Sequence, residues 1–344
     1  MTERVLVVGA GAIGGVATAH LTRAGHDVVV VDPDRVHTAA LRDPGLLLEE
    51  LDGRTSRIPL QAVSSVEELT GRFDFALLTV KSVALYAAVE PLVRADLVDT
   101  YVSLGNGLVQ TVVESIAGRD RLIVGLVEWG ATNLGPGHLR QTTSAPMVIG
   151  EIDGTETARL RRLQRILTAV APESRTSTSI GGQVWSKLLL NSTFSGLGAA
   201  GGCLYRDVAA DPVGREVALR LWVEGYDTAV ALGMALGEVF GVAPEELVTR
   251  DDRDRATAEA ALDRLMTRAG ATKASMLQDL ERGRTTEVDV INGGVVTAAA
   301  GIGRSAPLNA ELTRIVHEHE QGLSQPGPAA FERLRAVSGA DADR

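Results

Sequence analysis

The chain has 344 residues, which is longer than a single hydrophobic core usually grows, so we expect two domains. Its hydrophobic content of 45% and charged content of 23% are typical of a globular protein, and a net charge of −10 disfavours nucleic acid and anionic membranes as partners. A single cysteine excludes an intrachain disulfide and a thiolate metal cluster, and we expect no bound metal.

The N-terminal segment has no basic stretch followed by a long apolar run, so it does not resemble a signal peptide. No run approaches the ~18 apolar residues that cross a membrane. We therefore expect a cytoplasmic protein without a membrane partner.

The first predicted element is an apolar strand over residues 4–8, and a glycine-rich turn follows it at once. A helix then runs to about residue 23, and a second apolar strand covers residues 27–31. A dinucleotide-binding fingerprint requires this order of elements, because the helix N-terminus offers backbone N–H groups to phosphates. The predicted cofactor-binding residues in the turn are Gly9, Gly11, Ala12, Ile13 and Gly14.

Asp32 ends the second strand, where a carboxylate accepts hydrogen bonds from ribose hydroxyls and repels a 2′-phosphate. The sequence therefore favours NAD as the cofactor. NADP stays open, because Arg35 lies three residues later and could reach a phosphate. The alternative interpretation of Asp32 is a helix cap, since Asp32-Pro33 is typical of the start of a helix.

Strands and helices continue to alternate, with a strand at 73–80, a helix at 82–93 and a strand at 100–104. Ligands of open parallel sheets bind beyond the carboxyl ends of the strands. Lys81 and Asn106 follow two of these ends, so we predict that they contact cofactor or substrate. A solvated strand end is the alternative for Lys81.

Residues 121–150 contain extended segments joined by Gly135-Pro136-Gly137, which suggests an antiparallel addition to the sheet edge. After about residue 179 the strand pattern stops, and Ala/Leu-rich stretches predict helices over residues 183–197, 213–232, 256–269 and 287–300. The predicted organisation is an α/β Rossmann domain over residues 1–178, an all-α domain over 179–325 and a flexible tail over 326–344.

Only Lys81, Lys187 and Lys273 among the 34 basic residues are lysines. A lysine can release its proton, whereas an arginine guanidinium stays protonated. Lys187, Asn191 and Ser195 recur at every fourth position and are expected to share one helix face. Polar groups on an otherwise apolar helix need partners, and a substrate could supply them. An ordinary polar outer face is the alternative.

A turn is predicted between Ser275 and Glu287, because Gly283 should end one helix and Thr285 or Thr286 can cap the next. Ser275 and Glu287 could then face the same cleft. The alternative for Glu287 is a first-turn residue favoured by the helix dipole.

Taken in order, these motifs resemble the ketopantoate reductase (2-dehydropantoate 2-reductase) family. The resemblance covers roughly residues 4–320 and is thin between 205 and 270. The matching segments are the N-terminal GxGxxG, Lys81 after Leu-Leu-Thr-Val, Asn106-Gly107, Gly135-Pro136-Gly137, Ile149-Gly150-Glu151, Trp185-Ser186-Lys187-Leu188-Leu189-Leu190-Asn191, Ser275-Met276-Leu277-Gln278-Asp279, Thr286-Glu287, Ile291-Asn292-Gly293 and Pro307-Leu308-Asn309.

The resemblance implies a Rossmann domain, a helical C-terminal domain like that of 6-phosphogluconate dehydrogenase, and a cleft between them. It implies that Lys187 is the general acid and that Glu287 belongs to the active site. Asn191 and Ser275 would bind substrate, Ser195 would line the same subsite, and Asn106 would sit near the reacting carbon.

The activity implied is reduction of a 2-oxo acid by a nicotinamide cofactor, converting 2-dehydropantoate to pantoate or acting on a close analogue. The product would be a 2-hydroxy acid of pantothenate biosynthesis. A homodimer formed through the helical domain is also expected.

Two departures from the family pattern matter. Ser195 stands where a second asparagine is common, and Asp32 stands where a basic residue usually meets the NADP phosphate. The second interpretation is therefore an NAD-dependent D-2-hydroxyacid dehydrogenase that acts on a bulkier substrate.

A non-catalytic dinucleotide sensor is a third interpretation, although it would not need the polar set around Lys187. The 6-phosphogluconate-type 3-hydroxyacid dehydrogenases share the general plan, but the Ser-Met-x-Gln-Asp segment is not theirs.

Overall fold

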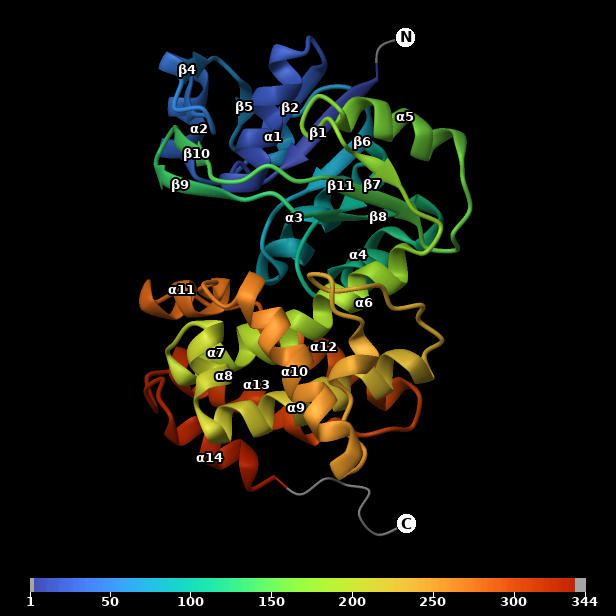
Figure 1. Ribbon diagram of the computed structural model, residues 1–344. Coiled ribbons are helices and arrows are strands. Elements are labelled where there is room, and N and C mark those ends of the chain that lie inside the picture. The colour runs from blue at the N-terminus through green and yellow to red at the C-terminus, as the bar shows by residue number, and fades with distance from the viewer. Residues whose placement is uncertain (1–2, 338–344) are drawn as a thin grey trace. The chain divides into compact units, whose positions relative to one another are not determined.

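A computed structural model describes residues 3–337 of the chain, which divides into two compact units (Figure 1). The first unit comprises the chain up to Gly105 together with Val109–Ile180. The second comprises Asn106–Leu108 and the chain from Gly181 onward. Within the described residues, every helix is too short or too polar to cross a membrane.

The first unit is built on an eight-stranded sheet in the order β12-β11-β8-β7-β6-β1-β2-β5. Six neighbouring strands, from β5 to β8 in that order, run parallel, whereas β11 is antiparallel to β8. A central β1 flanked by parallel strands confirms the predicted Rossmann class. The strands are β1 (Arg4–Val8), β2 (Asp27–Val31), β5 (Gln61–Val63), β6 (Phe73–Leu78), β7 (Val98–Ser103), β8 (Leu122–Val127), β11 (Met147–Glu151) and β12 (Arg175–Thr176).

Helices connect the parallel strands of this sheet. The first helix begins directly after the glycine-rich turn and ends at Arg23, where Gly25 adopts a φ of +81° and donates to the Thr22 carbonyl. A glycine in this conformation commonly ends a helix, and the helix ends where the sequence predicts, at residue 23. The helices are α1 (Ala12–Arg23), α2 (Arg35–Ala40), α3 (Ser82–Arg94), α4 (Val109–Ala117) and α5 (Ala158–Leu167).

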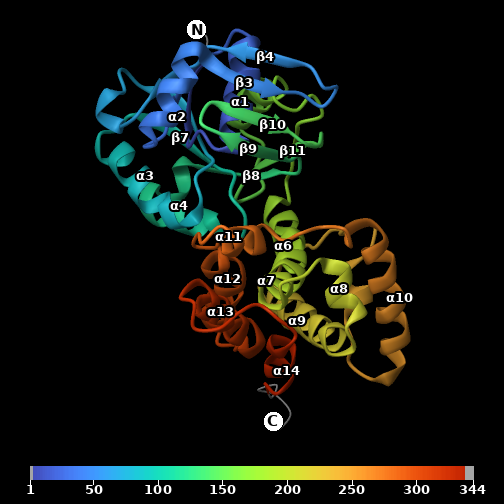
Figure 2. The same cartoon turned by 90° about the vertical axis from the view of Figure 1, so that its left-hand side faces the viewer.

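A second, four-stranded sheet has the order β4-β3-β10-β9 and lies beside α1 (Figure 2). The prediction that residues 121–150 add antiparallel strands to the edge of the main sheet is therefore only partly correct. Strand β11 does pair antiparallel with β8, but β9 and β10 form an antiparallel hairpin in the second sheet. Leu139 of this hairpin is fully buried and its side chain reaches Gly15 of α1, so the hairpin packs on α1. The strands are β3 (Leu46–Glu49), β4 (Thr55–Ile58), β9 (Ala131–Gly135) and β10 (His138–Gln141).

The second unit is helical, as predicted. Among its described residues, pairing of the β type is limited to one isolated bridge between Val239 and Val242. Its helices are α6 (Ile180–Leu190), α7 (Gly196–Gly201), α8 (Tyr205–Ala210), α9 (Pro212–Ala231), α10 (Asp252–Ala269), α11 (Ser275–Glu281), α12 (Val288–Gly301), α13 (Pro307–Glu320) and α14 (Ala329–Arg335).

The expectation of a flexible tail from residue 326 is wrong for residues 326–337. Helix α14 buries Phe331 and Leu334, and Arg333 pairs with Glu311 and Glu318 of α13. The apolar residues Phe331 and Leu334 lie three positions apart, which is a helical signal that the flanking prolines obscure in the sequence. The remainder of that prediction, residues 338–344, lies outside the described residues.

Candidate functional site

The glycine-rich turn after β1 has the geometry of a phosphate-binding loop. Gly9 has a φ of +97°, a conformation that favours glycine, and its N–H donates to the Val31 carbonyl at 2.8 Å. A Cβ on Gly14 would overlap the Gly9 carbonyl and Thr79 Oγ1, so glycine allows α1 to pack closely on the strands. A Cβ on Gly11 would meet no atom within 4 Å, which leaves the space there open.

The N-terminus of α1 is suited to an anion. Gly11 occupies the cap position, and no side chain of the described residues caps this helix. The first backbone N–H groups of the helix, including those of Ala12 and Ile13, are therefore left without a side-chain acceptor. A dinucleotide phosphate fits this end, because it supplies negative charge and acceptor oxygens.

Asp32 follows β2 and turns toward the same loop. Its carboxylate accepts hydrogen bonds from the backbone N–H groups of Ala10 at 2.7 Å and Asp34 at 2.9 Å. The residue that caps α2 is Asp34, which accepts from the N–H of His37. The helix-cap alternative for Asp32 is therefore wrong, and its carboxylate lies beside the glycine-rich turn.

His37, which the sequence did not indicate, also contacts the glycine-rich turn. Its Nε2 lies 2.8 Å from the Ala10 carbonyl, and its Nδ1 accepts the N–H of Gly137 at 3.0 Å. An Nδ1 that accepts must be unprotonated, so Nε2 carries the proton and donates to Ala10. Since Asp32 binds the Ala10 N–H, both polar groups of Ala10 are held in place.

Lys81 stands at the carboxyl end of β6. It occupies the cap position of α3 and is exposed. Two residues earlier, Thr79 Oγ1 donates to the carbonyls of Val8 and Gly9 at 3.0 and 2.8 Å. Lys81 is thus placed one residue beyond Val80, whose side chain reaches Gly9.

In the second unit, Lys187 lies in the last turn of α6 and is half-buried. Its neighbours Ser186 and Leu188 are buried. The helix then changes winding in a π-helical turn over Asn191–Ser195, where the Gly196 N–H donates five residues back to the Asn191 carbonyl. The regular every-fourth-residue face predicted for Lys187, Asn191 and Ser195 therefore ends at Asn191.

Ser195 nevertheless stays close to Asn191. Its Oγ donates to Asn191 Oδ1 at 3.4 Å, so the structure brings these two predicted residues together. Ser195 also hydrogen-bonds to the hydroxyl of Tyr205, a residue that the sequence did not indicate. The space beside this short side chain, where an asparagine is common in the family, is therefore occupied in part by the Tyr205 hydroxyl.

A buried polar network supports the π-helical turn. Asn292 Nδ2 donates to the Ser192 carbonyl at 2.7 Å and to Asn309 Oδ1 at 2.8 Å. Asn309 donates in turn to Glu224, whose carboxylate also accepts the Leu308 N–H at the start of α13. Burial raises the pKa of Glu224 in spite of these bonds. Asn292 and Asn309, which had no predicted role, thus hold the turn that carries Asn191.

Glu287 and Asn106 form a second close pair. Asn106 Nδ2 lies 3.4 Å from Glu287 Oε2, and Glu287 is 7% exposed. The Leu108 N–H donates to the Val290 carbonyl at 2.9 Å, which fastens residues 106–108 to the start of α12. Glu287 precedes α12, and Thr286 Oγ1 accepts the Val288 N–H there.

Ser275 begins α11 and is exposed, with Ala274 buried just before it. Lys273 forms an exposed ion pair with Glu281 on the same helix, at 2.6 Å. The remaining lysine is therefore a surface charge just before this helix.

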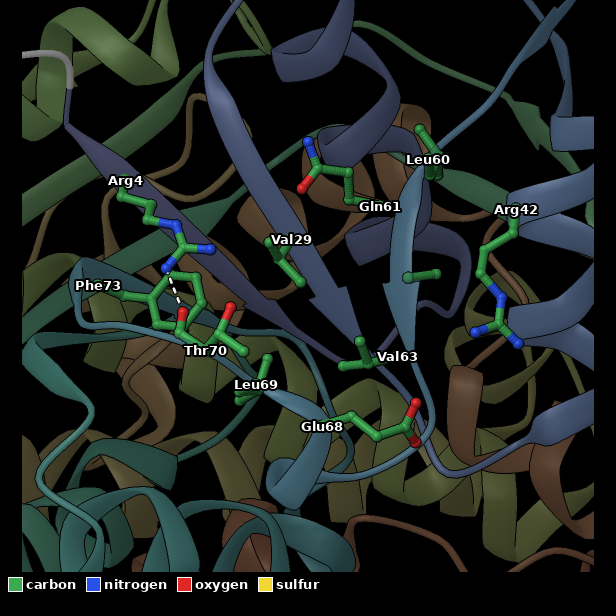
Figure 3. A pocket seen from close by; sticks show the side chains of 11 residues that line it. Arg4, Val29, Arg42, Leu60, Gln61, Val63, Glu68, Leu69, Thr70 and Phe73 are labelled. Carbon is green, nitrogen blue, oxygen red and sulfur yellow. Dashed lines mark hydrogen bonds between the residues drawn. The ribbon is translucent and has the colours of Figure 1, made fainter.

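A hollow of about 220 Å³ opens elsewhere in the first unit, at the edge of the main sheet (Figure 3). Arg4 donates there to the Thr70 carbonyl and stacks over the Phe73 ring, with its guanidinium carbon 4.4 Å from the ring centroid. Its lining contains none of the predicted site residues.

A Rossmann sheet with a dinucleotide fingerprint, followed by a helical unit with a half-buried lysine and polar neighbours, defines a nicotinamide-dependent oxidoreductase. Family comparison agrees. The ketopantoate reductase PanE/ApbA model matches residues 5–154, and the model of the C-terminal part of these proteins matches residues 179–320. The chain belongs to the ketopantoate reductase family, which confirms the resemblance seen in its motifs.

Individual relatives span nearly the whole chain. The 2-dehydropantoate 2-reductase of Aquifex aeolicus is 27% identical over 332 residues, covering 93% of this chain and 98% of that protein. The solved PanE/ApbA family ketopantoate reductase of Ralstonia eutropha is 25% identical, with a TM-score of 0.78 and coverage of 93% and 99%. D-mandelate dehydrogenase, solved with NADH and anilino(oxo)acetate, shares the fold at a TM-score of 0.77 and 22% identity, covering 93% and 99%.

Proposed function

We propose that this chain reduces the 2-keto group of 2-dehydropantoate or a close analogue, with Lys187 as the general acid. The observation that carries the proposal is a half-buried lysine four residues before Asn191, in a chain whose other basic residues are almost all arginines. When bound, the nicotinamide cofactor supplies the hydride.

Lys187 would supply the proton that the former carbonyl oxygen takes up. Negative charge develops on the former carbonyl oxygen during reduction, and a neighbouring ammonium stabilises that charge and donates the proton from Nζ. Asn191 and Ser275 would bind the substrate carboxylate, with Ser195 beside Asn191. Glu287 would orient the ammonium, and Asn106 would hold Glu287 through the hydrogen bond between them.

The test compares two substitutions of Lys187. Lys187→Ala is expected to lower kcat at least ~10²-fold while leaving cofactor affinity nearly unchanged. Lys187→Arg is the matched control, because it keeps the positive charge but does not release a proton. Near-normal turnover in either variant would contradict the role of Lys187 as the acid.

For the cofactor, we propose NAD, held by the turn from Gly9 to Gly14 with Asp32 on the ribose and Lys81 nearby. The test is separate titration with NADH and NADPH in the wild type and in Asp32→Asn. The amide keeps an acceptor for the Ala10 N–H but removes the charge that repels a 2′-phosphate. We expect the affinity ratio to move toward NADPH at least about fivefold, because charges about 4 Å apart near a surface interact by 1 kcal/mol or more. Tighter NADPH binding by the wild type would contradict NAD.

The substrate is tested by a panel of 2-oxo acids that includes 2-dehydropantoate and compounds with aromatic side chains. Preference for the aromatic compounds would favour the second candidate, an NAD-dependent D-2-hydroxyacid dehydrogenase, which Asp32 in place of the usual basic residue supports. Absence of turnover across the panel would favour a dinucleotide sensor. The expected homodimer stays a prediction, which sedimentation equilibrium would check.

A further inference from the structure

Tyr205 lies in the part of the chain where the family resemblance is thin. It begins α8, is 3% exposed, and its ring centroid lies 5.8 Å from that of Phe194. Its backbone N–H donates to the Thr272 carbonyl at 3.2 Å, three residues before Ser275. One residue therefore contacts both the π-helical turn and the segment that leads to Ser275.

The hydroxyl of Tyr205 is hydrogen-bonded to Ser195 Oγ. Ser195 has a single hydroxyl proton, and it donates that proton to Asn191 Oδ1. The bond between the two hydroxyls must then run from Tyr205 to Ser195. Burial raises the pKa of Tyr205, against the opposing effect of its bond to Ser195, so the phenol keeps its proton near neutral pH.

The direction of the hydrogen bond from Ser195 decides whether the oxygen or the nitrogen of the Asn191 amide is available to a ligand. Its Oδ1 accepts from Ser195, so its Nδ2 group, which takes no part in that bond, remains for another partner. Asn191 is half-buried, whereas Ser195 and Tyr205 are both buried. A group on Nδ2 must accept a hydrogen bond, as a carboxylate or carbonyl oxygen does.

We propose that Tyr205 is a positioning residue that orients the Asn191 side chain through Ser195, so that Asn191 presents hydrogen-bond donors to an acceptor oxygen of the substrate. The inference rests on the proposed function, because it takes Asn191 as a substrate ligand.

The test is Tyr205→Phe, which removes the hydroxyl and keeps the ring beside Phe194. Tyr101→Phe is the matched control, since the Tyr101 hydroxyl is also buried but has no hydrogen-bond partner among the described residues. We expect Tyr205→Phe to raise the KM for the 2-oxo acid about fivefold, the effect of one hydrogen bond between neutral groups, with kcat within about twofold. NADH affinity should be unchanged, and Tyr101→Phe should match the wild type.

A double-mutant cycle separates this role from simple packing. If Tyr205 acts through Ser195, the double variant Tyr205→Phe/Ser195→Ala has the same KM as Ser195→Ala alone. Additive effects on KM, or a lower melting temperature with unchanged KM, would overturn the proposal and leave the proposed function intact.

A second measurement does not depend on turnover. The Asn191 side-chain amide resonances, identified by their loss in Asn191→Asp, are expected to shift in Tyr205→Phe and to stay in place in Tyr101→Phe. If the wild type reduces no 2-oxo acid, the proposed function fails, and these resonances still decide whether Tyr205 orients Asn191. Resonances that do not move would overturn the positioning role.

Discussion

The two predicted binding regions of this protein are built in different ways. In the first unit the proposed binding groups are mainly backbone N–H groups of one short turn, Gly9–Gly14, at the start of a single helix. In the second unit they are side chains far apart in the sequence, such as those of Asn106, Asn191 and Glu287, and buried or partly buried hydrogen bonds hold them.

This difference shows where each region is sensitive to substitution. A backbone site tolerates changes of side chain except where space is absent, as at Gly14. A side-chain site depends on residues that contact no ligand, such as Asn292 and Tyr205, because removal of a buried partner leaves another polar group unsatisfied.

The largest effect on stability is expected in the backbone site. Gly14→Ala places a Cβ against the Gly9 carbonyl and Thr79 Oγ1, and should lower the free energy of unfolding by about 3 kcal/mol. Gly11→Ala is the control, because open space surrounds that position; its stability should change by less than about 0.5 kcal/mol. NADH affinity should nevertheless fall in Gly11→Ala, since the Cβ obstructs the approach of the pyrophosphate. Equal unfolding free energies for the two variants, measured by denaturant titration, would contradict the comparison.

Asn292→Ala tests the support of the side-chain site. It removes the donor to the Ser192 carbonyl and to Asn309 Oδ1, so we expect a loss of about 2 kcal/mol in unfolding free energy. The KM for the 2-oxo acid should rise as the π-helical turn shifts. Calorimetric NADH titration should give an unchanged affinity, and a weaker affinity would show that the support is not confined to the helical unit.

His37→Phe tests whether the backbone site also depends on a side chain. The change removes the donor to Ala10 and the acceptor for Gly137, so NADH affinity should fall about tenfold, the effect of roughly 1.4 kcal/mol. His138→Ala is the control, as His138 forms a partly exposed pair with Glu49 in the same unit. Equal NADH affinities in the two variants would mean that the turn holds its shape without His37.

The smallest effect is a dependence on pH in the helical unit. Burial lowers the pKa of His317, but hydrogen bonds to Glu320 and Asp289 raise it, and the folded-state pKa lies above its usual 6.5. The stabilisation is therefore fully present below the unfolded pKa and is lost as pH rises through the folded pKa. His317→Gln should lower the unfolding free energy by less than about 1 kcal/mol near pH 5.5 and by almost nothing near pH 9. An effect that grows with pH would contradict this sign.

Many strands and helices of the Rossmann unit could be predicted from the local sequence pattern. Continuous apolar runs such as residues 4–8 and 27–31 predict buried parallel strands, and glycines mark the turn and the helix end. The hairpin of β9 and β10 could not be assigned to its sheet in this way, because its position depends on the burial of Leu139 against α1. Helix α14 was missed because its apolar face is short and lies between prolines and a polar C-terminal segment.

The sequence by itself determined the family, the dinucleotide fingerprint and the choice of Lys187 as the candidate acid. These depend on residue type and local spacing, which can be read directly from the sequence. Only the tertiary structure decided that a π-helical turn carries both Asn191 and Ser195, that Asn292 supports this turn, and that Tyr205 contacts Ser195. Most of these contacts join residues that are distant in the sequence. Buried polar groups need hydrogen-bond partners, and only the folded structure shows which residues supply them.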